Sequence, residues 1–259
     1  MERQVKKALA QPSFLNIYKR LHLNLWTGSQ TAWLADSDIL ACDETISEEV
    51  LLNNVCYGGL DLASVRDLTS LVLAWRIGDK IICKHWTFIP EDKFEGRTGG
   101  KDGVNYQQFA DYLEITQGNV TDYNYVKAKI FELCDKYKVQ SIAFDRWNSS
   151  QLVIECIEEG VKMSAFGMGY KSLSPAAKEI ESKVMTGDFI YFNDPVIRWQ
   201  FANVQLESDP AGNIKPNKAK SSDKIDTIMA LCMAVGEEMY SEAPVVSKYK
   251  RDNKGFFTI

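Results

Sequence analysis

Three aspartates stand where they could act on one chemical group. Asp61 interrupts the apolar run YGGLDLASVRDLTSLVLAW, Asp145 ends the run VQSIAFD, and Asp226 lies near the start of SSDKIDTIMALCMAVG. A buried carboxylate costs several kcal/mol unless another group compensates its charge. The sequence therefore predicts a salt bridge or a bound metal ion at Asp61, and the other two acids help to decide between them.

Converging carboxylates repel one another, and divalent cations relieve that repulsion. Mg²⁺ prefers carboxylate oxygens and water. Two such ions about 3.5–4 Å apart can activate a water molecule and stabilise the leaving oxygen of a phosphodiester. We therefore expect two Mg²⁺ or Mn²⁺ ions held by Asp61, Asp145 and Asp226. Asp223 is the alternative third ligand, although its place at the start of a helix also suits an N-cap.

Each acid also has an ordinary structural explanation. Asp61 could be a strand-end residue, Asp145 could pair with Arg146, and Asp226 could be a first-turn acid favoured by the helix dipole. The occurrence of all three on matching elements of one topology makes the metal site the better interpretation. Asp67 could assist that site or cap the turn before the next strand, and its structural role is favoured.

A local run of lysines lies beside the third aspartate. It consists of Lys215, Lys218, Lys220 and Lys224. Next to a metal site, such a run is suited to contacts with DNA phosphates, and a solvated loop is the alternative. The net charge of −5 argues against a chain that is basic all over, but it leaves room for a local basic groove.

Cysteine and histidine usage excludes other kinds of site. The six cysteines form no CxxC pair, and the two histidines have no ligand spacing to them, so we expect reduced core cysteines and no zinc site. No apolar run approaches the roughly 20 residues that span a bilayer. The N-terminus lacks the apolar region of a secretory signal, which favours a cytoplasmic protein.

The elements that must position the aspartates form a recognisable order. Three strands joined by short links are expected at 55–63, 68–76 and 80–88, followed by strands at 139–145 and 162–168 that alternate with helices. Helices are expected at 107–113, 123–137, 149–159, 174–185, 196–203 and 223–240, and a hairpin is expected at 204–218. This order predicts an α/β fold of ribonuclease H-like type, a mixed central sheet with helices on both faces. In that topology, the strands with Asp61 and Asp145 are neighbours.

Other parts of the chain look different from this core. Residues 1–50 are expected to form an arm, residues 51–240 the main domain, and residues 241–259 a basic flexible tail. Pro175 is expected in the first turn of its helix. The helix at 123–137 carries an apolar stripe of Val126, Ile130, Leu133 and Tyr137. In the last helix, Asp226 lies beside a small-residue face, Ala230 and Met233–Ala234, which is expected to pack close to the sheet. Trp147, Trp199 and Phe201 are expected in the core.

Nearly the whole chain resembles the C-terminal nuclease domain of the large terminase subunit of tailed double-stranded DNA bacteriophages. The stretch LHLNLWTGSQTAWL resembles the link between the ATPase and the nuclease of that family. The other segments that carry the resemblance are GLDLASVRDLTSLVL, WTFIPED, YKVQSIAFDRWNSSQL, LSPAAKEIESKVMTGDFIYFNDPVIRW and IKPNKAKSSDKIDTIMALCMA.

The resemblance implies a two-metal endonuclease that cuts concatemeric viral DNA during genome packaging. It places the acidic triad of the family on Asp61, Asp145 and Asp226, and an auxiliary hairpin at about 204–218. It implies double-stranded DNA, the ATPase part of the same full-length protein, the small terminase subunit and the portal as partners. The implied location is the cytoplasm of the infected bacterial host.

One departure and two alternatives accompany this resemblance. The GGK of residues 99–101 does not fit G-x-x-x-x-G-K-[ST], so we expect no ATPase activity in this chain and a fragment that begins near the linker. One alternative is another ribonuclease H-like enzyme of resolvase or transposase type. The other is a catalytically silent DNA-packaging scaffold.

Overall fold

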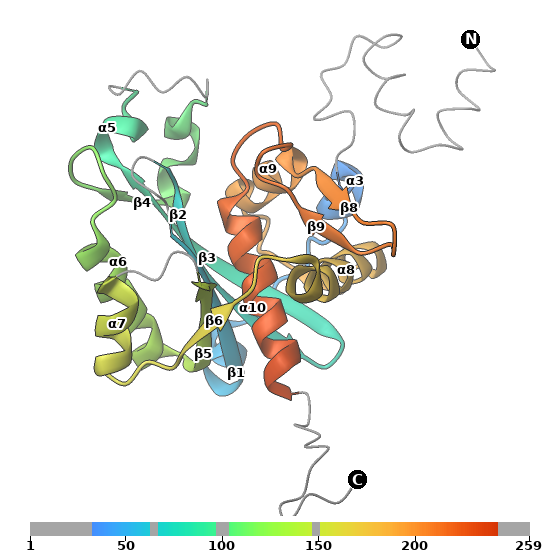
Figure 1. The fold of residues 1–259 in the computed structure, drawn as a ribbon, viewed down its shortest axis with the longest axis horizontal. Coiled ribbons are helices and arrows are strands. Elements are labelled where there is room, and N and C mark those ends of the chain that lie inside the picture. Colours follow the sequence, from blue (N-terminus) through green and yellow to red (C-terminus); the bar gives the residue numbers. More distant parts are fainter. Residues whose placement is uncertain (1–32, 63–66, 97–103, 147–150, 243–259) are drawn as a thin grey trace, which may run out of the picture.

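The computed structural model describes residues 33–62, 67–96, 104–146 and 151–242 (Figure 1). Trp147 and the tail beyond residue 242 lie outside these residues. The described elements are α3 (Asp36–Leu40), α4 (Glu48–Asn53), β1 (Val55–Asp61), β2 (Thr69–Ile77), β3 (Lys80–Pro90), α5 (Glu91–Phe94), η1 (Tyr106–Tyr112), β4 (Leu113–Thr116), α6 (Tyr123–Lys136), β5 (Lys138–Asp145), α7 (Gln151–Glu158), β6 (Met163–Phe166), α8 (Tyr170–Thr186), β7 (Phe189–Ile190), α9 (Pro195–Asn203), β8 (Leu206–Ser208), β9 (Ile214–Pro216) and α10 (Asp226–Glu242). No described helix is long and apolar enough to cross a membrane.

A mixed sheet with the strand order β4-β3-β2-β1-β5-β6 forms the centre of the molecule. Strands β1, β2 and β3 make the expected antiparallel meander. Strand β5 pairs parallel with β1, and β6 pairs parallel with β5. Strands β4 and β7 pair with different parts of the outer edge of β3. The strands that carry Asp61 and Asp145 are therefore neighbours, as the sequence predicted.

Helices cover both faces of this sheet (Figure 1). Alternate side chains of β2 point to opposite faces. Val72 packs in the cluster that contains α8, α9 and α10, whereas Leu71 packs in the cluster that contains α6 and α7. Helix α6 buries the predicted stripe of Val126, Ile130 and Leu133. This layered α/β arrangement is the ribonuclease H-like fold.

Helix α10 approaches β1 more closely than a strand side chain would allow. A Cβ atom at Gly59 would lie 1.9 Å from the carbonyl oxygen of Ala230 and 2.7 Å from the backbone nitrogen of Ala234. These alanines belong to the small-residue face that the sequence predicted would approach the sheet. Because Asp226 begins α10 and Asp61 ends β1, this contact helps to fix the distance between the two acids.

Two predicted helix starts are wrong, for identifiable reasons. The final helix begins at Asp226 and not at residue 223, and the helix with Pro175 begins at Tyr170. Pro175 therefore lies inside α8, where it has no N–H to donate to the carbonyl of Lys171. The hydroxyl of Tyr240 donates to that carbonyl at 2.8 Å, which compensates for the missing bond.

The predicted helix at 107–113 is partly correct. The segment forms the 3₁₀ helix η1 and then the short strand β4, which the sequence did not reveal. Strand β4 has four residues, too few for a clear alternation of polar and apolar side chains. The expected helix 196–203 and the hairpin within 204–218 are present as α9 and as β8 with β9.

The described part of the expected N-terminal arm packs on the main core. Trp33 and Leu34 are buried in the cluster that contains α8 and α9, and Ile39 and Cys42 join them. The backbone nitrogen of Trp33 donates to the carbonyl of Val204 at 3.2 Å. Residues 33–42 are therefore part of the same packed unit as the sheet.

The predicted core residues divide between two environments. Phe201 is 1% exposed and belongs to the core, as expected. Trp199 is partly buried and packs against Tyr106 and Phe109 at the side of the molecule. All six cysteines are free thiols in the structure, and five of them are buried, as the sequence predicted.

Replacement of Gly59 by alanine tests the close approach of α10. Gly59→Ala should lose roughly 3 kcal/mol of folding stability, because the added methyl group meets backbone atoms that cannot rotate away. Gly169→Ala is the control, since its methyl group would meet no atom within 4 Å and its φ of −88° suits any residue. Urea unfolding followed by circular dichroism measures both. Equal unfolding midpoints would contradict the packing described here.

Candidate active site

The structure brings the three predicted aspartates to one end of the sheet. Asp61 is the last residue of β1 and Asp145 the last residue of β5. The parallel register pairs Leu60 with Phe144, so the next residues along both strands are the two acids. Asp226 lies in the first turn of α10, which packs on the same face of the sheet.

A β-bulge in β5 directs Asp145 to the same face of the sheet as Asp61. Cys56 pairs with Val139, but Gly58 pairs with Ile142, so β5 contains one extra residue between these pairs. Successive strand residues point to opposite faces, and a one-residue shift exchanges the faces. Without the extra residue, Asp145 would point to the face of the sheet opposite Asp61.

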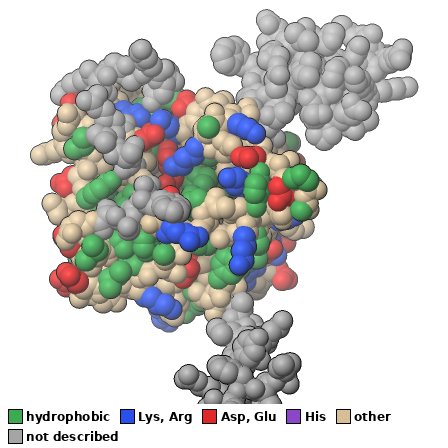
Figure 2. Space-filling view, viewed as in Figure 1, with side chains coloured by type: hydrophobic (Ala, Val, Ile, Leu, Met, Phe, Trp, Pro, Cys, Tyr) green, Lys and Arg blue, Asp and Glu red, His purple; other side chains and the backbone are tan. Residues whose placement is uncertain are grey.

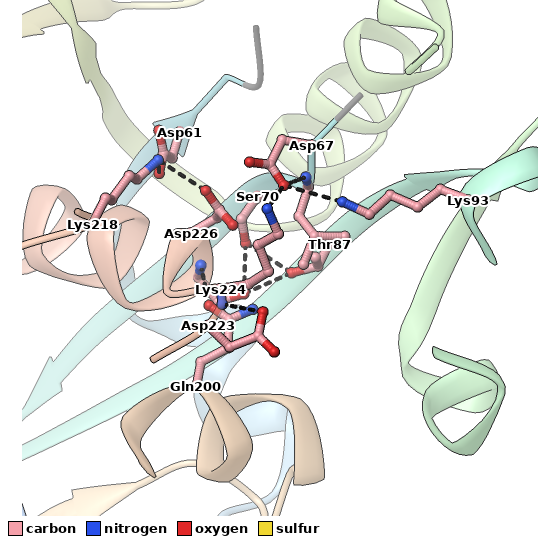
Figure 3. A network of polar contacts seen from close by, with 12 residues as sticks. Asp61, Asp67, Ser70, Thr87, Lys93, Gln200, Lys218, Asp223, Lys224 and Asp226 are labelled. Carbon is pink, nitrogen blue, oxygen red and sulfur yellow. Dashed lines mark hydrogen bonds and ion pairs between the residues drawn. The ribbon is translucent and has the colours of Figure 1, made fainter. Parts of the chain in front are cut away.

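The side chain of Lys218 lies between two of the acids (Figure 3). Its Nζ atom donates a hydrogen bond to Asp226 Oδ1 at 2.8 Å and forms an ion pair with Asp61 Oδ2 at 2.6 Å. The side chains of Asp61 and Asp226 are 4% and 5% exposed, whereas that of Lys218 is 47% exposed. Lys218 thus reaches from the surface to two buried carboxylates.

The electrostatics of these groups reflect their crowding. The pKa of Asp61 is raised to about 7, chiefly by burial and also by the charges of Asp226 and Asp145, while Lys218 opposes the rise. Burial alone would lower the pKa of Lys218, but the two carboxylates outweigh it and raise that pKa. All three acids therefore interact, and the buried negative charge requires a cation.

The donor set fits a divalent cation, although no complete metal cluster is present. Among the described residues, no group of three Asp, Glu, His or Cys side chains lies close enough together to hold a metal ion. Asp226 Oδ2 is buried and accepts no hydrogen bond from the described part of the chain, whereas Asp61 Oδ2 is buried with the Lys218 ammonium as its partner. Carboxylate oxygens of this kind are ligands that Mg²⁺ prefers. The ammonium of Lys218 stands where positive charge is needed.

Asp223 does not stand at the N-cap position expected of it, because α10 begins at Asp226. It lies before α10, and its Oδ1 accepts a hydrogen bond from the backbone nitrogen of Lys224 at 2.8 Å. The backbone nitrogen of Thr227, in the first turn of α10, donates to Gln200 Oε1 at 2.7 Å. The N-terminal turn of α10 is thus held by a side chain from α9.

Asp67 forms a separate ionic group beside the site (Figure 3). Its Oδ1 lies 2.6 Å from Lys224 Nζ and 3.3 Å from Lys93 Nζ, and it accepts a hydrogen bond from the backbone nitrogen of Leu68. Burial opposes the effect, but the hydrogen bond from Lys224 and the two lysine charges hold the pKa of Asp67 below its usual range. These contacts support a structural role at the start of β2.

The four lysines of the predicted DNA-binding run have different surroundings. Lys218 contacts the acids, and Lys224 pairs with Asp67. Lys215 lies on β9, with its ammonium 5.1 Å from the centre of the Tyr170 ring, and Lys220 is exposed. Figure 2 shows Lys and Arg side chains around Asp and Glu side chains in the upper part of the face that carries α10. Positive and negative groups therefore alternate around the site.

Sequence reasoning missed the buried polar residues beneath the acids. Ser70, Thr87 and Thr227 are each 0% exposed, and their hydroxyl groups contact one another (Figure 3). The available signal was a polar residue at a core-facing position within a predicted buried strand. Lys218 had no comparable signal, because only the fold brings it to Asp61.

Comparisons with known proteins show which family this chain is similar to. The sequence model of the family described as "Terminase large subunit, endonuclease domain" matches residues 1–242. The chain is 32% identical over 243 residues to the terminase large subunit of Enterobacteria phage HK97, a match that covers 91% of this chain and 47% of that protein. It is 24% identical over 254 residues to protein YmfN of Escherichia coli K12, covering 92% of this chain and 55% of that protein.

A comparison with solved structures points to the same family. The crystal structure of the HK97 large terminase matches with a TM-score of 0.71 and 32% identity, over 90% of this chain and 49% of that chain. The chain spans about half the length of the curated relatives it matches. Because the family match covers residues 1–242 and the HK97 protein is similar in both sequence and structure, the chain belongs to the family of terminase large subunit endonuclease domains.

Proposed function

We propose that this chain is a metal-dependent endonuclease that cuts double-stranded concatemeric viral DNA during genome packaging. The observation that carries the proposal is the meeting of Asp61, Asp145 and Asp226 at one end of the sheet, where the buried Asp226 Oδ2 accepts no hydrogen bond from the described residues. Membership of the terminase endonuclease family supports the same reaction and the same substrate.

In this proposal, Asp61, Asp145 and Asp226 would hold two Mg²⁺ or Mn²⁺ ions. When bound, such ions supply the positive charge that activates a water molecule and stabilises the leaving oxygen of a phosphodiester. The chain contributes rigidity, because two of the acids end neighbouring central strands and the third lies on a helix packed against them. Asp223 remains the alternative third ligand, but its bond to the Lys224 backbone favours Asp226.

Lys218 has two roles in the proposal. In the metal-free protein, its ammonium compensates the buried charges of Asp61 and Asp226. With these acids engaged by cations, the ammonium turns to a DNA phosphate. Lys215, Lys220 and Lys224 provide further phosphate contacts at the edge of the site.

The proposal extends to partners beyond the described residues. The matched relatives are about twice as long as this chain, and the family function joins a nuclease to an ATPase in one full-length protein. We therefore propose that the nuclease works with that ATPase part, with the small terminase subunit and with the portal. The reaction takes place in the cytoplasm of the infected bacterial host.

Removal of divalent cations tests the metal requirement. Cleavage of a supercoiled plasmid should stop in excess chelator and return with Mg²⁺ or Mn²⁺, because the water must be activated by a metal ion. Ca²⁺ should bind without supporting cleavage, since its looser coordination positions the water poorly. Gel electrophoresis measures nicked and linear products. Full activity in chelator would exclude the metal mechanism. No cleavage with any cation would favour the catalytically silent scaffold. Cleavage of branched DNA alone, in a parallel assay, would favour a resolvase.

Substitution of each candidate third ligand separates Asp226 from Asp223. Asp226→Asn should remove nearly all cleavage while thermal stability changes little, because the loss of one bond to Lys218 is offset by relief of carboxylate repulsion. Asp223→Ala should cost roughly 1 kcal/mol of stability, from its lost hydrogen bond, and leave much of the activity. Thermal melts and plasmid nicking measure both properties. An inactive Asp223→Ala protein beside an active Asp226→Asn protein would transfer the ligand role to Asp223.

Replacement of Lys218 by methionine tests its role as a counter-ion. Without metal, Lys218→Met should lose roughly 1–3 kcal/mol of stability, because two buried carboxylates lose their cation. Added Mg²⁺ should raise its melting temperature more than that of the unmodified protein. Lys220→Met is the matched control for stability, which it should leave unchanged. It should also reduce the slope of log DNA affinity against log salt concentration by up to about 0.9, the value for one phosphate contact. Equal responses of both variants to Mg²⁺ would refute the counter-ion role.

A further inference from the structure

Three buried hydroxyl groups form a closed triangle beneath the candidate active site. Ser70 lies on β2, Thr87 on β3 and Thr227 in the first turn of α10 (Figure 3). The Ser70 hydroxyl donates to Thr227 Oγ1 at 3.0 Å, and Thr87 Oγ1 lies 2.8 Å from Ser70 Oγ and 2.9 Å from Thr227 Oγ1. We call these three residues the hydroxyl triangle. It joins two strands and a helix at one point.

The hydroxyl triangle is directly connected to the elements that carry two of the acids. Thr227 follows Asp226 in the chain, and Ser70 is the cross-strand partner of Asp61 in the antiparallel pair of β1 and β2. The backbone nitrogen of Thr227 is also bonded to Gln200 on α9. A shift of any hydroxyl would therefore move the first turn of α10 relative to the end of β1.

His85 lies between the hydroxyl triangle and the carboxylate of Asp194. Its Nδ1 atom lies 2.9 Å from Thr87 Oγ1, and its Nε2 atom lies 3.0 Å from Asp194 Oδ2. The His85 side chain is 2% exposed. The angle at Nε2 does not suit a hydrogen bond to Asp194, so their interaction is electrostatic. A carboxylate at this distance attracts a ring N–H and repels a ring lone pair, so Asp194 favours the tautomer with hydrogen on Nε2. Nδ1 is then an acceptor for the Thr87 hydroxyl.

That tautomer gives every hydroxyl hydrogen a direction. Thr87 donates to His85, Thr227 donates to Thr87, and Ser70 donates to Thr227. The three hydroxyl hydrogens thus serve four contacts, because the Ser70 hydrogen is shared between Thr227 and Thr87. The opposite tautomer would make His85 a donor to Thr87 and would turn the Thr87 hydrogen back into the triangle. The position of one ring hydrogen thus sets the hydrogen-bond pattern beneath Asp226.

The Asp194 end of this network is itself firmly held. Asp194 is the N-cap of α9, and its Oδ1 accepts hydrogen bonds from the backbone nitrogens of Val196 at 2.8 Å and Ile197 at 3.1 Å. The two residues before it, Phe192 and Asn193, have positive φ angles of 57° and 54°. A phenylalanine rarely adopts this conformation, and such strain persists only where surrounding contacts over-determine it. The fold thus holds the carboxylate facing His85 at a cost in backbone energy.

We propose that His85 is a positioning residue that, through the hydroxyl triangle, holds Asp226 in register with Asp61. Asp194 fixes the tautomer of His85, and Thr87 passes that constraint to α10. The inference rests on the proposed nuclease function for its consequence, but the hydrogen-bond pattern can be measured without any cleavage. Partners behind metal ligands commonly change metal affinity or activity by about 10–100-fold when they are removed.

The tautomer can be read directly, because the chain has only two histidines. In protein labelled with ¹⁵N-histidine, the ring nitrogen shifts of His85 should show hydrogen on Nε2, and His22→Gln assigns the signals. Asp194→Asn should move the ring toward a mixture of both tautomers. An Nδ1–H tautomer in the unmodified protein, or an unchanged ring after Asp194→Asn, would overturn the proposal whether or not the protein cuts DNA.

The functional consequence is tested with Thr87→Val, Thr87→Ser and Thr116→Val. Thr87→Val should raise the Mg²⁺ concentration for half-maximal cleavage about tenfold, because it keeps the shape and removes the hydroxyl. Thr87→Ser should restore the original value. Thr116→Val is the matched control, since Thr116 is 2% exposed on β4 and lies outside the hydroxyl triangle. Equal Mg²⁺ requirements of Thr87→Val and Thr116→Val would overturn the proposal.

The same variants separate this proposal from the proposed function. Binding of Mg²⁺ by calorimetry replaces the cleavage assay if the unmodified protein proves inactive, and the expected change for Thr87→Val is the same tenfold weakening. Absence of cleavage together with a weakened Thr87→Val would contradict the nuclease and support the positioning role. Normal cleavage by the unmodified protein, with unchanged Mg²⁺ affinity in Thr87→Val, would support the nuclease and contradict the positioning role.

Discussion

The structure of the site depends on the compensation of negative charge in a place that solvent hardly reaches. Asp61 and Asp226 are almost fully buried, and their mutual repulsion, together with burial, disfavours the ionised form of Asp61. Lys218 supplies one positive charge from the loop before α10. The close packing at Gly59 keeps the acids near each other in spite of their repulsion. The fold therefore maintains an arrangement that the charges alone would push apart.

Much of this arrangement could be predicted from local patterns. Alternating and continuous apolar runs identify β1, β2, β3 and β5, and the order of elements makes β1 and β5 neighbours. That order predicts that Asp61 and Asp145 lie together, as they do in the structure. The alanines of α10 predicted a close approach to the sheet, which the contact with Gly59 confirms. These predictions succeeded because each depends on periodicity or residue size.

The remaining features depend on contacts between distant segments. Pro175 looked like a helix start, but tertiary bonding by Tyr240 lets α8 begin earlier. Asp223 looked like a helix cap, but Gln200 from another helix accepts the Thr227 hydrogen bond. Lys218 is predicted from the sequence as one lysine of a DNA-binding run, and only the folded chain reveals its contact with Asp61. No local pattern contains this information, because the partner lies far away in sequence.

The extra residue in β5 affects how related sequences should be compared. Val139 and Ile142 pack on the same side of the sheet although three positions separate them, which only the bulge permits. A relative with one residue fewer in this segment could retain an aspartate at the corresponding strand end, yet that aspartate would be directed away from the centre. An alignment gap between these two positions is therefore a marker of a redirected carboxylate that residue identity alone would not reveal.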